Sequence, residues 1–301
     1  MIYMVWVPLL VPFLAGPAGR RLVSCLPPRQ SSWLLTLTAA GLAVSSTAAL
    51  ALLVVPGATH VHAVAAIGGL LTPLSTGSPD AVVAVAMVAA VLLVWCAAVP
   101  ARRLHRLGAQ LRRARRLAAG ADGELVVLKD DSPDAYALPG RPGKVVVTSG
   151  MLRALSAAER EALFAHERAH LTGRHHRFLT VVELAGLCHP GLRALREPLS
   201  YALERSADET AARAVGRAAL AARATRSPGA GRPGFALAGP VPRRVAALLS
   251  SGAPTRGRRR TSHVIAAALL ACLVLSAAAA LEAADDLHAG IEIAHGESPR
   301  D

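Results

Sequence analysis

Cysteine is scarce in this 301-residue chain, and the few cysteines present are widely separated. The four occur at Cys25, Cys96, Cys188 and Cys272, with no CxxC or comparable pair among them. Disulfide frameworks and cysteine zinc sites both depend on closely or regularly spaced cysteines. The sequence therefore indicates neither a disulfide framework nor a cysteine zinc site.

Charged side chains are absent from four long apolar stretches, although the chain as a whole carries a formal charge of +13. Each stretch approaches or reaches the roughly 20 residues that a helix needs to cross a bilayer. No basic residue precedes the first stretch, as a signal peptide would require, so a span is favoured over a cleaved leader there. The predicted transmembrane helices cover about residues 2–18, 33–55, 81–99 and 263–281.

Lysine and arginine are also absent from the loop between the second and third predicted spans, residues 56–80. Arginine instead gathers in the segments 20–29, 102–116 and 256–260, each next to a predicted span. Basic residues favour the cytoplasmic side of a membrane. We therefore expect a multi-pass protein of the cell membrane, in contact with the lipid bilayer, with both termini extracytoplasmic and residues 101–262 in the cytoplasm.

The excess of arginine has a second explanation, which is nucleic-acid binding through a basic surface. No recognisable nucleic-acid-binding module accompanies the charge. Arginine runs beside membrane spans are ordinarily topological anchors that also favour anionic lipid. We therefore expect no direct binding to nucleic acid.

The cytoplasmic segment divides by composition into a domain at 101–222 and a basic linker, rich in proline, glycine and arginine, at 223–262. The final residues, 282–301, form a short acidic tail that we place outside the cell. Within the domain, β-branched or extended runs at 124–128, 135–138 and 144–148 predict a small sheet that includes a hairpin. Helices are predicted from Ser156 to Gly173, from about Arg177 to Leu187 and from Pro198 to Gly216. The second is too short to span a bilayer, so we expect it to pack on the first or to dip into the membrane surface.

The first of these helices carries the sequence HERAH, in which His166 and His170 are four residues apart. Ser156 and Glu159 form the S-x-x-E pattern of a capping box, which predicts the helix independently of the motif. Side chains four apart on a helix project from one face, so the two imidazoles can share a metal ion. Glu167 then lies where the H-E-x-x-H signature of metalloproteases places a general base.

A catalytic zinc ion needs a third protein ligand. Glu204 is the best candidate, with Asp208 one turn later on the same face to support a ligating histidine. From spacing alone an ordinary solvated face is equally acceptable, with Arg205 paired to Asp208 or Glu209. His175 and His176, just beyond the motif helix, are explained by capping and dipole effects and are not assigned to catalysis.

The runs AYALPG, VVVTSGML, LSAAEREALFAHERAHL and ERSAD together resemble the HtpX-type and BlaR/MecR-type membrane zinc peptidases, over roughly Leu125 to Val215. The short gap between the motif and ERSAD, with three spans before the domain and one after it, looks closer to the BlaR/MecR antirepressor type. However, the chain has no SxxK motif and only about twenty residues after the last span, in contrast to those β-lactam sensors.

The resemblance implies a mostly α membrane protein with four transmembrane helices and a cytoplasmic α+β zincin-like (gluzincin) metallopeptidase domain. It implies one Zn²⁺ bound by His166, His170 and Glu204, with Glu167 catalytic and Asp208 supporting a ligand. It also implies that the extended AYAL run is an edge strand that pairs with substrate. The implied activity is a zinc metalloendopeptidase acting on a cytoplasmic or membrane-proximal protein, with a BlaI-type winged-helix repressor in a signalling pathway as one candidate substrate. Two alternatives remain: HtpX-like quality control of membrane proteins, and a non-catalytic membrane receptor.

Overall fold

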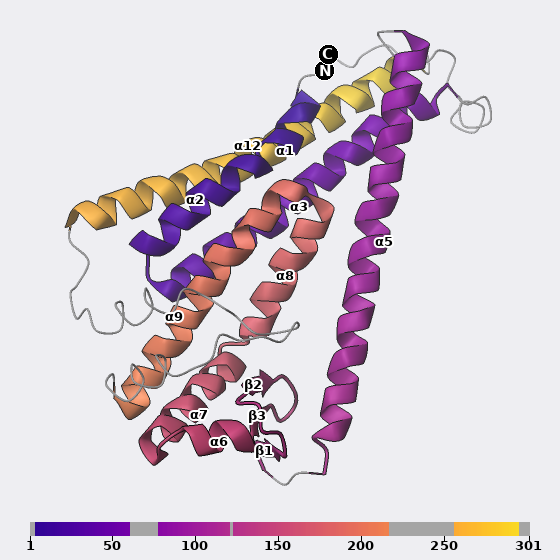
Figure 1. The fold of residues 1–301 in the computed structure, drawn as a ribbon. Coiled ribbons are helices and arrows are strands. Elements are labelled where there is room, and N and C mark those ends of the chain that lie inside the picture. The colour runs from indigo at the N-terminus through magenta and orange to yellow at the C-terminus, as the bar shows by residue number, and fades with distance from the viewer. Residues whose placement is uncertain (1–3, 61–77, 121–122, 217–255, 295–301) are drawn as a thin grey trace.

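The computed structural model describes residues 4–60, 78–120, 123–216 and 256–294, and these residues are mostly helical (Figure 1). Three of the described helices are long and apolar enough to cross a membrane. They are α3 (Pro28–Ala58), α5 (Pro79–Leu117) and the Val264–Ala289 part of α12 (Arg256–Ala294). These helices correspond to the second, third and fourth predicted spans.

The first predicted span is divided among η1 (Met4–Trp6), α1 (Val7–Leu10) and α2 (Pro12–Cys25). Proline has no backbone N–H and clashes with the preceding turn, and Pro12 begins α2 where α1 ends. With 14 residues, α2 is about 21 Å long, which is less than the roughly 30 Å hydrocarbon core. A fourth transmembrane helix therefore stays a prediction.

Two helices extend well beyond the predicted ends of their spans. α5 continues to Leu117, so the arginines at 102–116 lie on a helix and not in a loop. Alanine, leucine and arginine are good helix formers, and their number outweighs Pro100 and Gly108, both of which lie inside the helix. α12 likewise begins at Arg256, inside the predicted linker, and continues to Ala294, inside the predicted tail. The rest of that linker, 223–255, the end of the predicted domain, 217–222, and the last residues, 295–301, lie outside the described part of the chain.

Large apolar side chains lie exposed along the outer faces of these long helices. Val91, Val94 and Trp95 of α5 are 55–67% exposed, and Val274 and Leu281 of α12 are 64% and 67% exposed. Exposed apolar surface of this extent is unfavourable in water but is what lipid chains contact. The exposure therefore supports a membrane protein.

The sheet lies at the far end of α5 from the other long helices, together with α6 (Ser149–Ala154) and α7 (Ala157–Thr172) (Figure 1). Its strands are β1 (Leu125–Leu128), β2 (Ala135–Leu138) and β3 (Lys144–Thr148), in the order β1-β3-β2. β2 and β3 are antiparallel, as the predicted hairpin requires, whereas β1 runs parallel to β3. Both β1 and β2 are therefore edge strands.

Helix α8 (His175–Cys188) follows α7 and packs mainly on the apolar helices α3 and α5. Of the two expectations for this helix, packing on α7 is only a minor contact, and a position at the membrane surface stays a prediction. Its buried Val182 and Ala185 join a core that includes Leu35 and Leu42 of α3, because its apolar face matches the surface of that helix. After the short η2 (Pro190–Leu195), α9 (Arg196–Val215) returns alongside α7.

Candidate metal centre

Helix α7 begins and ends where its sequence signals predict. The Ser156 side chain accepts a hydrogen bond from the Glu159 backbone N–H, and the Glu159 carboxylate accepts one from the Ser156 backbone, 2.9 Å away. Leu163 is buried against Val147 of β3 and Met151 of α6, which fixes the helix on the sheet. His166 and His170, three and seven residues after Leu163, project from the adjoining side of α7, where Glu204 and Asp208 of α9 face them.

Small side chains bring α7 and α9 close together. Ala162 and Ala211 are both buried at this interface, with 0% and 1% of their surface exposed. Because neither side chain extends beyond Cβ, the two helices can approach closely. The approach places Glu204 and Asp208 of α9 opposite the histidines of α7.

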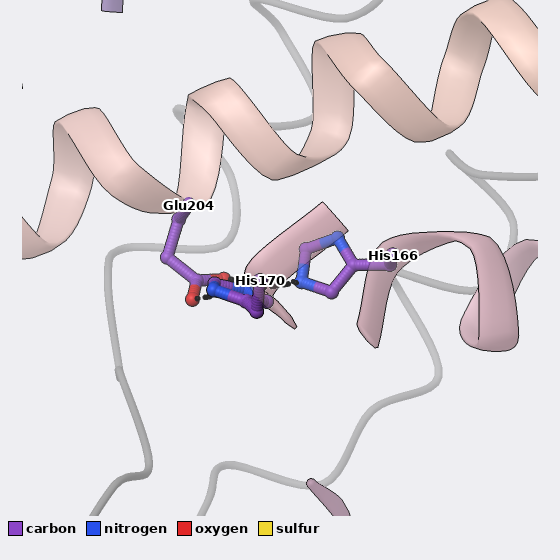
Figure 2. Close-up of side chains that lie close together, drawn as sticks. All are labelled: His166, His170 and Glu204. Carbon is purple, nitrogen blue, oxygen red and sulfur yellow. Dashed lines mark hydrogen bonds and ion pairs between the residues drawn. The ribbon is translucent and has the colours of Figure 1, made fainter. Parts of the chain in front are cut away.

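His166, His170 and Glu204 converge on a small volume, as Figure 2 shows for the three side chains. The two Nε2 atoms are 3.1 Å apart. Glu204 directs Oε1 to His170 Nε2 at 3.3 Å and Oε2 to His166 Nε2 at 3.6 Å. Two imidazole nitrogens of α7 and the two carboxylate oxygens of one glutamate of α9 therefore face one another.

These separations fit a tetrahedral zinc ion. Zinc binds imidazole nitrogen and carboxylate oxygen at about 2.0–2.2 Å, so two tetrahedral ligand atoms should lie about 3.3–3.6 Å apart. The measured separations of 3.1, 3.3 and 3.6 Å lie within a few tenths of an ångström of that range. Two histidines and one glutamate also leave the fourth position open, as catalytic zinc sites do.

The charge at the centre also favours a cation. Glu167, Glu204 and Asp208 are only 7%, 5% and 1% exposed, so three carboxylates are withdrawn from water within two adjoining helices. Buried carboxylates are costly unless they are paired or coordinate a metal ion. A divalent cation between α7 and α9 would offset that cost.

Each motif histidine is held at its second ring nitrogen by a different neighbour. His166 Nδ1 lies 2.9 Å from Asp208 Oδ1, and both side chains are buried. His170 Nδ1 lies 2.9 Å from His175 Nδ1, so one of these two nitrogens donates and the other accepts. Such partners fix the tautomer and orientation of ligating imidazoles.

The structure thus resolves the two readings of the α9 face in favour of an inward orientation. Glu204 and Asp208 are buried toward α7, while Arg205 pairs with Glu209 at 3.0 Å on another face of the helix. The assignment of His166, His170 and Glu204 as ligands, Glu167 as catalyst and Asp208 as support stays a prediction, now with a consistent geometry.

His175 is the residue that the sequence reasoning missed. Arg174 adopts a left-handed conformation, with φ 51°, and so starts α8 in a direction that returns His175 to His170. Gly173 makes room for the ring, because a Cβ at this position would collide with the His175 side chain. Burial, followed by the electrostatic effect of the neighbouring His170, lowers the pKa of His175 to about 3. His175 is therefore neutral near pH 7, so its contact with His170 Nδ1 is a hydrogen bond of a neutral imidazole.

The fold and the centre together indicate a membrane-associated metallopeptidase. Residues 98–190 match the model of Peptidase family M48. The match supports a metallopeptidase of this family and a metal-dependent reaction on a protein substrate. It includes the HERAH motif and His175 but ends before Glu204 and Asp208. No curated protein and no solved structure matches the chain.

Proposed function

We propose that the chain is an integral membrane zinc metalloendopeptidase of the gluzincin type, with one Zn²⁺ per chain. The observation that carries the proposal is the convergence of His166, His170 and Glu204 at separations suited to zinc. The M48 match and the three apolar helices support the same conclusion. BlaR/MecR-type and HtpX-type activities are both compatible with that match.

The proposed roles follow from position and chemistry. His166, His170 and Glu204 would hold the zinc ion, and Asp208 and His175 would keep the two imidazoles in place. When bound, zinc supplies a Lewis acid that polarises the scissile carbonyl and acidifies a water molecule. Glu167, buried beside His166 on α7, would take a proton from the attacking water and deliver it to the leaving amine.

Substrate would enter along β2. This strand lies at an edge of the sheet and packs on α7, next to the centre. The unpaired edge of a strand can bind an extended peptide through main-chain hydrogen bonds. The structure therefore favours a substrate segment that is extended and unfolded where it is cut.

We place the peptidase domain in the cytoplasm and both termini outside, because arginine gathers at one end of the spans. A cytoplasmic or membrane-proximal protein would then be the substrate. A BlaI-type winged-helix repressor, which would give the chain a role in signalling, is the leading candidate, and HtpX-like quality control is the alternative. A repressor encoded by the adjacent gene would favour signalling.

The test compares the full-length chain with Glu167→Gln in lipid nanodiscs. We expect the wild type to contain one zinc ion and to cleave the candidate repressor or itself, and Glu167→Gln to retain zinc but lose at least about 99% of the cleavage. Zinc is measured by mass spectrometry of the elements and cleavage by gel electrophoresis. Glu161→Gln is the matched control, because Glu161 is an exposed residue of the same helix and should leave both unchanged.

Equal cleavage by wild type and Glu167→Gln would contradict the assigned mechanism. Absence of zinc from the wild type would contradict the site. Cleavage of unfolded membrane proteins but not of the repressor would move the assignment to quality control.

A further inference from the structure

A cavity of about 680 Å³ lies beside the metal centre, between the start of α3, the α7–α8 junction and α9. Its size is within the about 300–1,000 Å³ typical of small-molecule sites. His175 lines it, but His166, Glu167, His170 and Glu204 do not. The cavity therefore adjoins the centre, and His175 belongs to both.

Arginine side chains from several elements surround the cavity. Arg29 comes from α3, Arg174 from the α7–α8 junction, Arg177 from α8 and Arg213 from α9. All four are exposed, so their charges remain available at the rim. The single carboxylate in the lining, Glu209, is paired with Arg205 at 3.0 Å. The rim therefore favours an anion.

The inner wall of the same cavity is apolar. Trp33 of α3 and Phe178 of α8 meet edge to face with ring centroids 4.9 Å apart, and Leu203 is buried behind them. Ser32 and Thr36 are also in the wall, but each hydroxyl donates to a backbone carbonyl of its own helix, at 2.9 and 2.8 Å. The donor hydrogens of these two hydroxyl groups are therefore already used within the helix, and the wall favours an apolar ligand group.

The position of the cavity relates this chemistry to the membrane. α3 is a candidate span that starts at Pro28, so Arg29 lies at its end and Trp33 about one turn further in. Tryptophan is enriched where a span meets the membrane surface, and basic pockets between spans bind anionic lipid headgroups. A charged rim above an apolar wall at the end of a span matches one headgroup and its acyl chain.

We propose that this cavity binds an anionic phospholipid, with the phosphate among the arginines and the acyl chain against Trp33 and Phe178. An acidic protein segment would use the rim but not the apolar wall, so lipid explains both halves of the cavity. The proposal concerns neither the metal nor peptide cleavage, and its test is independent of both.

The test uses quenching of Trp33 fluorescence by brominated lipid. In the full-length chain with Trp6→Phe and Trp95→Phe, Trp33 is the remaining tryptophan. The protein is placed in two series of phosphatidylcholine nanodiscs, one with increasing fractions of brominated phosphatidylglycerol and one with increasing fractions of brominated phosphatidylcholine. We expect half-maximal quenching at about a tenfold lower fraction of the anionic lipid.

Arg29→Gln with Arg177→Gln should remove this preference, since the two substitutions take one charge from each side of the cavity. Arg112→Gln with Arg113→Gln is the matched control, because both are exposed arginines of α5 outside the cavity. It removes the same charge and should keep the preference. Arg29→Lys with Arg177→Lys should also keep it, and circular dichroism checks that each variant is folded.

Equal quenching by the two lipids in the unsubstituted background would overturn the proposal. The proposal would also be overturned if the Arg112→Gln, Arg113→Gln control lost the lipid preference to the same extent. The preference would then come from the overall charge of the chain. Binding of a penta-glutamate peptide that requires Arg29 and Arg177, without a lipid preference, would assign the cavity to an acidic protein segment instead.

Discussion

At the scale of single residues, His166 shows how the centre is held from both sides. Its Nε2 faces Glu204 and its Nδ1 faces Asp208, both on α9 and one helical turn apart. A ring held at both nitrogens cannot rotate without losing a contact. The orientation of this candidate ligand therefore depends on Asp208 as well as on α7.

Asp208→Ala should weaken zinc binding by about 10–100-fold, because loss of an outer carboxylate releases the ligating ring. The measurement is competition for zinc with a chelator of known affinity, in detergent. Glu209→Gln, one residue later but directed at Arg205, should bind zinc as the wild type does. Equal affinity in all three proteins would show that Asp208 does not position His166.

The sequence identifies some members of this centre better than others. HERAH is a local pattern on a capped helix, so it predicts His166, Glu167 and His170 without knowledge of the fold. Glu204 is 34 residues further on, and only the packing of α9 on α7 distinguishes it from a solvated glutamate. His175 depends on the left-handed Arg174 and the space at Gly173, a local backbone feature that spacing does not reveal.

At the scale of elements, the contact between α7 and α9 determines whether the ligands meet. Ala162 and Ala211 are buried at the contact, and larger side chains would separate the helices. The histidines and Glu204 come from opposite sides of this interface. A change in packing should therefore affect metal binding without touching a ligand.

Ala162→Leu should destabilise the protein by about 1–3 kcal/mol, because added volume in a packed interface forces the helices apart. It should also weaken zinc binding by moving Glu204 away from α7. Thermal unfolding in detergent and chelator competition measure the two effects. Ala158→Leu, at an exposed position of the same helix, should alter neither, and a similar loss in both variants would contradict the account.

Element boundaries were predictable where a specific stop signal exists. Ser156 and Gly173 bound α7 as expected, because a capping box and a glycine act locally. α5 was expected to end near Val99, because hydropathy falls there. Hydropathy indicates where a helix leaves the bilayer, whereas the helix itself continues to Leu117. The arginine-rich continuation has high helix propensity, so the helix extends beyond its apolar part.

At the scale of the whole molecule, α5 and α8 are linked by a salt bridge near the end of the apolar part of α5. Arg103 Nε donates to Glu183 Oε1 at 2.6 Å, and both side chains are about one-third exposed, at 32% and 31%. The pair joins the helix that reaches the sheet to the helix that carries His175. It therefore connects the long helices to the candidate centre.

Glu183→Arg should lower the midpoint of thermal unfolding by roughly 2–6 °C, because it places two positive charges at this contact. Arg103→Glu combined with Glu183→Arg should recover most of the loss, since the attraction is restored with reversed polarity. Scanning fluorimetry in nanodiscs gives the midpoints. Failure of the double variant to exceed the single variant would show that the two side chains do not interact appreciably.

The unbroken course of α5 has one more consequence. Its 39 residues measure about 58 Å, and a bilayer core takes up about 30 Å of that length. The length of the remaining portion would fix the distance between the sheet and the membrane. The neighbouring candidate metal centre would lie at a similar distance. A protein substrate would therefore have to place the bond that is cut at a fixed distance from the bilayer. That distance would select substrates, in addition to the amino-acid sequence around the bond.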